Sequence, residues 1–184
     1  MISDKIILGI DPGTRILGWG VIKVTGNKAF FLEMGVIDLH LDKDHYHKLR
    51  SIYNGVLDLI ARFKPTEMAV EAPFYGKNVQ SMFVLGRAQG AAITAALSSE
   101  IQVTEYAPRK IKMAITGRGA ASKEQVASLL CNMLKIDNSS EYLDATDGVA
   151  VAYCHFLESA RPTISNGGKS NWKEFVKNNP GRVK

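Results

Sequence analysis

The sequence contains few cysteines, and they follow no pairing pattern. Its 184 residues include two, Cys131 and Cys154, which stand far apart and form no CxxC pair. A disulfide-stabilised scaffold or a cysteine-based zinc finger is therefore not expected. Both cysteines fall within apolar patterns of helical spacing, so we expect buried thiols in a reducing compartment.

Long hydrophobic runs are also missing. No stretch of about 18 apolar residues occurs, and residues 1–11 do not combine a basic leader with a long apolar core. We therefore expect a soluble, cytoplasmic protein with no membrane partner. The hydrophobic content of 46% is nevertheless ordinary for a globular protein, which excludes disorder of the whole chain.

Acidic residues are scarce in two places, although the whole chain carries 23 basic and 18 acidic residues and a net charge of +5. Residues 161–184 hold six basic side chains and one acid, so we expect a basic, flexible C-terminal tail after a domain formed by residues 1–160. A solvated terminus without a role is the alternative. A second basic segment, partly a loop because it contains Gly117 and Gly119, comprises Arg109, Lys110, Lys112, Arg118 and Lys123.

The apolar pattern predicts an α/β fold. Strands are indicated near residues 5–10, 19–24, 29–39, 68–71 and 102–106. Gly26-Asn27 reads as a hairpin turn, and helical spacing occurs around residues 49–60, 78–98, 122–133 and 144–157. Ser122 and Gln125 are expected to form a capping box at the start of the third of these helices, which would bury Val126, Leu129, Leu130 and Met133. We expect a five-stranded mixed sheet, with three antiparallel strands followed by two parallel ones, flanked by helices.

Carboxylates stand where this fold would gather them. Asp11 ends the first strand, Glu71 ends the fourth, and Asp144 and Asp147 open the last helix on one face. Four converging carboxylates repel one another unless cations are present. Oxygen ligands select Mg²⁺ or Mn²⁺, and two such ions about 4 Å apart can drive phosphodiester hydrolysis.

Three of the acids also have a purely structural interpretation. Asp11 before Pro-Gly suits a turn, and Asp144 suits a helix N-cap with Asp147 in the first turn. Glu71, at the end of an apolar strand, is not explained in this way, because an unpaired acid near a core is costly. A metal site uses all four residues.

The motifs that carry these acids resemble those of a known family. They are Gly9-Ile10-Asp11-Pro12-Gly13-Thr14-Arg15, Glu71-x-x-Phe74 with Lys77-Asn78, Gly117-x-Gly119-x-x-x-Lys123 and Asp144-Ala145-x-Asp147-Gly148-Val149-Ala150. Over residues 5–160 they are similar to the RuvC family of Holliday junction resolvases. The sequence departs from many relatives at Ala72-Pro73, and the tail matches no motif.

The resemblance implies a ribonuclease H-like nuclease domain and a homodimer that nicks two opposed strands of four-way junction DNA with Mg²⁺. It also implies a junction-migrating motor complex as partner. Asp11, Glu71, Asp144 and Asp147 would be the catalytic metal ligands. The residues expected to contact DNA are Phe74, Lys77, Arg109, Lys110, Lys112, Arg118 and Lys123.

The position of Phe74 suggests a role independently of the family resemblance. In a loop three residues after Glu71, an exposed aromatic ring can stack on a splayed base; a core aromatic that closes the neighbouring helix onto the sheet is the alternative. Met82 and Phe83 are the expected dimer face. The four histidines form no convincing zinc set.

Three functions are compatible with the sequence. The first is the junction endonuclease. The second is another ribonuclease H-like nuclease, acting on RNA or an RNA–DNA hybrid. The third is a non-catalytic junction-binding module or an actin-like ATP-binding fragment, although no GxxxxGK[ST] phosphate loop is present.

Overall fold

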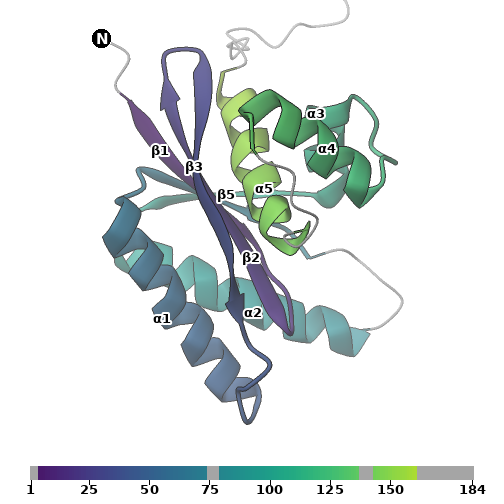
Figure 1. Cartoon of the computed structure of the whole chain (residues 1–184). Helices are drawn as coiled ribbons and strands as arrows, with labels where there is room; N and C mark the ends of the chain where they lie inside the picture. The colour runs from purple at the N-terminus through teal and green to yellow at the C-terminus, as the bar shows by residue number, and fades with distance from the viewer. Residues whose placement is uncertain (1–3, 74–78, 137–142, 161–184) are drawn as a thin grey trace, which may run out of the picture.

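A computed structural model describes residues 4–73, 79–136 and 143–160 of the chain. One sheet lies between two groups of helices (Figure 1). The strands are β1 (Lys5–Asp11), β2 (Ile16–Thr25), β3 (Lys28–Asp38), β4 (Glu67–Glu71) and β5 (Gln102–Tyr106). The helices are α1 (His45–Phe63), α2 (Val79–Ser98), α3 (Pro108–Thr116), α4 (Lys123–Leu134) and α5 (Leu143–Ser159).

The sheet has the order β3-β2-β1-β4-β5. The pairs β1–β2 and β2–β3 are antiparallel, whereas β1–β4 and β4–β5 are parallel. The expected mixed sheet is thus confirmed, as is the hairpin at Gly26, whose φ of +60° suits glycine. The β1–β4 ladder ends at Ile10 and Val70, so Asp11 and Glu71 follow at the same edge.

The two faces of the sheet have separate cores. Helices α1 and α2 cover one face with Ile52, Val56 and Ala92, while α3, α4 and α5 cover the other (Figure 1). Cys131 and Cys154 are buried and unpaired, as expected. Among the described residues, no helix is long and apolar enough to span a membrane.

The structure corrects two expectations on the face formed by α3 to α5. Helix α3, which the sequence analysis did not predict, begins at Pro108 and buries Ile111 and Ile115, so most of the basic segment is helical. Leu129 and Met133 were expected to be buried, but they are 40% and 44% exposed. Helix α4 packs through a neighbouring face instead, with Val126, Ala127, Leu130 and Cys131 inward. Its predicted capping box of Ser122 and Gln125 is confirmed.

Helix α5 lies unusually close to the sheet. A Cβ atom at Gly148 would come within 2.4 Å of the Trp19 backbone, and one at Gly18 within 2.0 Å of the Asp144 carbonyl oxygen. Glycine at these two positions therefore lets the start of α5 approach β2. Because β2 lies beside β1, this contact brings the first turn of α5 to the edge where Asp11 lies.

The far end of α5 is fixed by a buried polar chain. His155 Nδ1 lies 2.8 Å from the Tyr106 hydroxyl group, and His155 Nε2 lies 2.9 Å from Glu67 Oε2. Lys5 Nζ donates to Glu67 Oε1 at 2.6 Å. Burial raises the pKa of Glu67, but the hydrogen bonds from Lys5 and His155 outweigh it and hold that pKa below its usual value. Helix α5 is thus anchored to β1, β4 and β5.

Candidate active site

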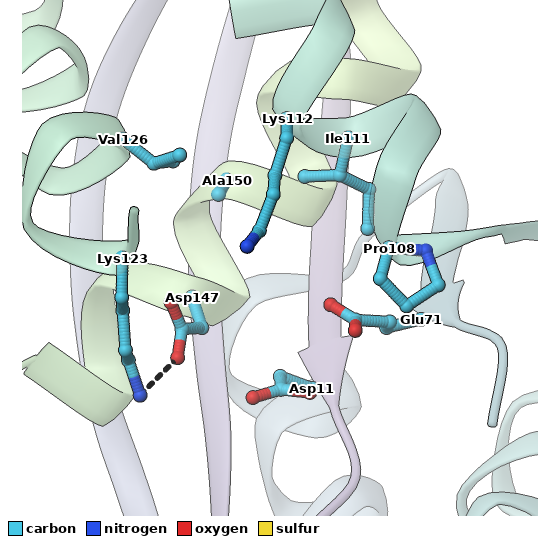
Figure 2. Close-up of a pocket in the computed structure, with 9 residues that line it drawn as sticks. All are labelled: Asp11, Glu71, Pro108, Ile111, Lys112, Lys123, Val126, Asp147 and Ala150. Atoms are coloured by element: carbon cyan, nitrogen blue, oxygen red, sulfur yellow. Dashed lines mark ion pairs between the residues drawn. The ribbon is translucent and has the colours of Figure 1, made fainter. Parts of the chain in front are cut away.

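Three carboxylates line one pocket at the carboxyl edge of the sheet. Asp11 from β1, Glu71 from β4 and Asp147 from α5 surround a hollow of about 150 Å³ (Figure 2). The amino group of Lys112 points down from α3 toward these acids. The pocket is completed by Pro108, Ile111, Lys123, Val126 and Ala150.

A second hollow shares two of the acids. Asp11 and Glu71 also line a space of about 210 Å³ on the other side, together with Pro12, Pro73 and Leu85 of α2. These two carboxylates are therefore accessible from both sides. A phosphodiester chain that passed through both hollows would cross directly over them.

The carboxyl groups raise one another's pKa values. Burial, followed by the nearby Asp147 carboxylate, raises the pKa of Asp11 to about 7. Burial, followed by Asp11 and Asp147, raises the pKa of Glu71 to about 8. Burial also raises the pKa of Asp147. A cation that compensates the charge of Asp11 and Glu71 would therefore favour their ionised forms near neutral pH.

Lys123 supplies such a positive charge. Its Nζ atom lies 2.8 Å from Asp144 Oδ1 and 2.5 Å from Asp147 Oδ2 (Figure 2 shows the second pair). Burial lowers the pKa of Lys123, but the hydrogen bonds to these two carboxylates overcome this effect and raise it above the usual value. The ammonium group therefore joins Asp144 to the acids of the pocket.

The residues fit a hard divalent cation by their chemistry. The acids offer only oxygen atoms, which Mg²⁺ and Mn²⁺ prefer, and burial, followed by the charge of neighbouring carboxylates, raises the pKa values of Asp11 and Glu71. In the part of the chain that the structure describes, no three potential ligands are already gathered tightly enough to hold one ion. Lys123 is instead paired with both Asp144 and Asp147, so an ion held by these two acids would compete with its ammonium group.

The expected DNA-contact residues take different positions. Lys112 faces the carboxylates, whereas Lys110 points elsewhere, with Nζ 2.7 Å from Glu158 Oε2 and 5.6 Å from the centre of the Tyr106 ring. Arg109 and Arg118 are exposed. The side-chain stem of Arg109 crosses Gly119, where a Cβ atom would lie 2.7 Å from Arg109 Cγ. Phe74 and Lys77 lie outside the described residues.

Two residues at the site were missed by sequence reasoning. Pro108 begins α3 and lines the pocket, and a proline followed by Ile111 and Ile115 at helical spacing is a signal that could have revealed it. Gln89 of α2 is buried and donates a hydrogen bond to the main-chain oxygen of Glu71. A single glutamine in an apolar helix carries no comparable sequence signal.

Comparison with known proteins identifies the family. The family model for crossover junction endodeoxyribonuclease RuvC matches residues 7–155. The RuvC protein of Bacteroides fragilis is 56% identical over 185 residues, covering 100% of this chain and 98% of the relative. That of Photobacterium profundum is 43% identical over 166 residues, covering 90% and 94%. The chain belongs to the RuvC family.

Solved RuvC structures share its fold. Thermus thermophilus RuvC in complex with a Holliday junction substrate superposes with a TM-score of 0.77 at 30% identity, covering 84% of this chain and 94% of that one. The yeast mitochondrial resolvase Ydc2, at 13% identity and a TM-score of 0.58, shows the fold alone. The ribonuclease H-like fold and the assignment as a crossover junction endodeoxyribonuclease are thereby confirmed.

Proposed function

We propose that this RuvC family member resolves Holliday junctions in recombination and repair by Mg²⁺-dependent hydrolysis, nicking two opposed strands symmetrically as a homodimer. The observation that carries the proposal is the meeting of Asp11, Glu71 and Asp147 in one pocket, with Asp144 joined to them through Lys123. Members of the RuvC family are metal-dependent nucleases, and these are the side chains of the site suited to hold the ions.

Each group at the site has a part in hydrolysis. Asp11, Glu71, Asp144 and Asp147 would hold two Mg²⁺ ions, for which Mn²⁺ can substitute. Bound metal supplies activation of the attacking water and charge stabilisation of the leaving oxygen. The carboxyl groups of Asp11 and Glu71, with pKa values near 7 and 8, release their protons as cations enter. Lys112, aimed into the pocket, can pair with a phosphate oxygen of the strand being cut.

The exposed basic residues around this pocket would hold the junction arms. Arg109 and Arg118 lie outside the pocket on α3 and the loop that follows it, and Lys123 begins α4. Such phosphate contacts position DNA without reading its sequence, and their number sets the slope of affinity against salt. The Lys110 ammonium is already paired with Glu158 and that of Lys123 with Asp144 and Asp147, so each would have to leave an ion pair to contact DNA. Stacking by Phe74 and contact by Lys77 stay predictions.

Helix α2 carries the surface best suited to a second copy of the chain. Val79, Phe83, Gly86, Gly90 and Leu97 recur along one stripe, and Phe83 is 66% exposed. Open space lies where Cβ atoms of Gly86 and Gly90 would stand. In a two-fold dimer the aromatic ring of one copy could rest over the glycines of the other.

This dimer surface can be tested by sedimentation velocity. Phe83→Glu places a charge in the stripe and is expected to give a monomer. Leu41→Glu, at a 94% exposed position outside the stripe, serves as the control and should sediment as wild type. A Phe83→Glu protein that remains dimeric would remove α2 from the interface.

The remaining expectations extend the proposal. The tail of residues 161–184 lies outside the described residues, and its division from a nuclease domain of residues 1–160 stays a prediction. A branch-migration motor complex as partner and a cytoplasmic location also stay predictions.

The deciding experiment compares three substrates. Labelled mobile four-way junction, linear duplex and RNA–DNA hybrid are incubated with wild type and with Asp144→Asn, in Mg²⁺ and in chelator. We expect paired, symmetric nicks in the junction alone, lost in chelator and in the variant. Cutting of the hybrid would favour another ribonuclease H-like activity, and junction binding without nicking would favour a non-catalytic module.

A further inference from the structure

A buried amide side chain touches the strand end that carries Glu71. Gln89 of α2 is 7% exposed. Its Nε2 atom donates to the main-chain oxygen of Glu71 at 3.3 Å and to Oε2 of Glu105 at 2.8 Å. Because Glu71 ends β4 and Glu105 belongs to β5, one amide group connects α2 to both strands at the active-site edge.

The end of β4 depends on such contacts. The β1–β4 ladder stops at Val70, so Glu71 lies one residue beyond the pairing with β1. From the β5 side, the Ala72 amide donates to the main-chain oxygen of Tyr106 at 2.9 Å. From the α2 side, Gln89 binds the Glu71 carbonyl oxygen. A buried carbonyl group without a partner is costly, so the Gln89 contact favours one position of this backbone.

Gln89 approaches this edge as part of a continuous helix face. Leu85, one turn earlier in α2, lines the hollow that also contains Asp11 and Glu71. Helix α2 thus contacts the strand end through an apolar side chain and a hydrogen-bond donor placed one turn apart.

The chemistry of the amide suits this position. Its NH₂ group supplies two hydrogens, enough for a carbonyl oxygen and a carboxylate oxygen at once. It carries no charge, so it adds neither a cation that would compete with a metal ion nor a further anion beside the carboxylates. A lysine or a glutamate at this position would alter the field at Glu71.

We propose that Gln89 is a positioning residue for metal-dependent cleavage. By fixing the main chain of Glu71, it holds that carboxylate toward Asp11 and Asp147 so that the acids can take a shared ion. This inference rests on the proposed function, in which Glu71 is a metal ligand. Outer residues that orient metal ligands are typically worth about 10- to 100-fold in metal affinity or activity.

The test uses Gln89→Met in the full-length protein without DNA. Methionine keeps an unbranched, buried side chain but removes both donated hydrogens. Calorimetric titration with Mn²⁺ is expected to show roughly tenfold weaker binding. Hydrogen exchange at the Ala72 amide, which reports the end of β4, should become faster than in wild type while the central core amides stay protected.

Glu105→Ala is the matched control. It removes the other acceptor of the Gln89 amide but leaves the Glu71 carbonyl oxygen available, so Mn²⁺ affinity and Ala72 exchange should remain as in wild type. If Gln89→Met does not fold, Gln89→Asn replaces it, because its side chain is one methylene shorter and withdraws the donor from the Glu71 carbonyl oxygen.

The outcomes separate the inference from the function on which it rests. Wild-type Mn²⁺ affinity and Ala72 exchange in Gln89→Met would overturn the positioning role. So would a uniform rise in exchange of all core amides, which signals general destabilisation. Glu71→Gln is assayed for junction cleavage in parallel. If it cuts normally, the proposed function fails; if it is inactive while Gln89→Met binds Mn²⁺ normally, only the inference fails.

Discussion

The Lys123 ammonium group and the Asp147 carboxylate form an ion pair, with Nζ 2.5 Å from Oδ2. The same ammonium binds Asp144, so one side chain from the start of α4 bridges both acids at the start of α5. The Lys123 ammonium group therefore neutralises part of the negative charge that divalent cations are proposed to neutralise. We therefore expect entry of metal to be linked to departure of this amino group from Asp147.

This linkage predicts that removing the lysine favours metal. Lys123→Met deletes a competing positive charge beside the carboxylates. At pH 8.5, above the wild-type pKa values of about 7 for Asp11 and about 8 for Glu71, Mn²⁺ should bind the DNA-free protein about tenfold more tightly, measured by calorimetry. Lys110→Met is the control, since its ammonium pairs with Glu158, and it should bind Mn²⁺ as wild type. Equal or weaker binding by Lys123→Met would contradict the competition.

The raised carboxyl pKa values predict an unusual pH dependence of stability. In chelator, unfolded Asp11 and Glu71 lose their protons near pH 4, whereas the folded groups keep them until about pH 7 and 8. The unfolded state therefore binds fewer protons in this window, and the free energy of unfolding falls as pH rises from about 4 to 8. Urea denaturation at several pH values measures the slope.

Asp11→Asn removes part of the loss in the free energy of unfolding that the ionised acids cause at high pH. It should stabilise the metal-free protein at pH 8 by on the order of 2 kcal/mol and change stability little at pH 4. The same substitution should abolish the stabilisation that Mg²⁺ gives to wild type. A variant that is less stable than wild type at pH 8 in chelator would show that the acids do not repel one another in the folded protein.

The close packing of α5 predicts that Gly148 is intolerant of substitution. A Cβ atom in Gly148→Ala would meet the Trp19 backbone at 2.4 Å, so α5 must shift away from β2. We expect a loss of about 1–3 kcal/mol in the free energy of unfolding and weaker Mn²⁺ binding, because Asp147 moves with the helix. Gly26→Asn is the control, since its hairpin site has open space around it and a backbone that asparagine tolerates. Unchanged Mn²⁺ affinity in Gly148→Ala would uncouple this packing from the site.

Metal affinity should itself depend on pH. The carboxyl groups must lose their protons to become ligands, so Mn²⁺ binding to wild type should strengthen between about pH 6 and 8, with protons released on binding. Calorimetry in buffers of different ionisation enthalpy counts these protons. Binding that is independent of pH across this range would place the metal away from Asp11 and Glu71.

Sequence periodicity was sufficient to predict the sheet and to place Asp11 and Glu71 at its edge. Asp11 and Glu71 each end an apolar strand, and parallel pairing of those strands brings them together. Helix α3 was missed because its nine residues begin with a proline and mix basic with apolar side chains, a composition that also suits a loop. Leu129 and Met133 were misplaced because helical spacing gives the faces of α4 but not which one the neighbouring helices cover.

The sequence did not reveal which groups the individual polar side chains contact. Lys123 was expected to face phosphate, yet its contacts in the structure are with Asp144 and Asp147, which lie more than twenty residues away. Lys110 pairs with Glu158, and Gln89 binds the main chain of Glu71. These contacts arise from the packing of α2, α3, α4 and α5 around the sheet, so no local sequence pattern predicts them.

The central claim is that the carboxylates of β1, β4 and α5 share divalent cations. Anomalous scattering from crystals grown with Mn²⁺ locates such ions directly. Peaks are expected at coordination distance, about 2.1–2.2 Å, from oxygen atoms of Asp11, Glu71 and Asp147, with Lys123 displaced from Asp147. Saturating Mn²⁺ that leaves this pocket without a peak, while the Lys123–Asp147 pair persists, would contradict this claim.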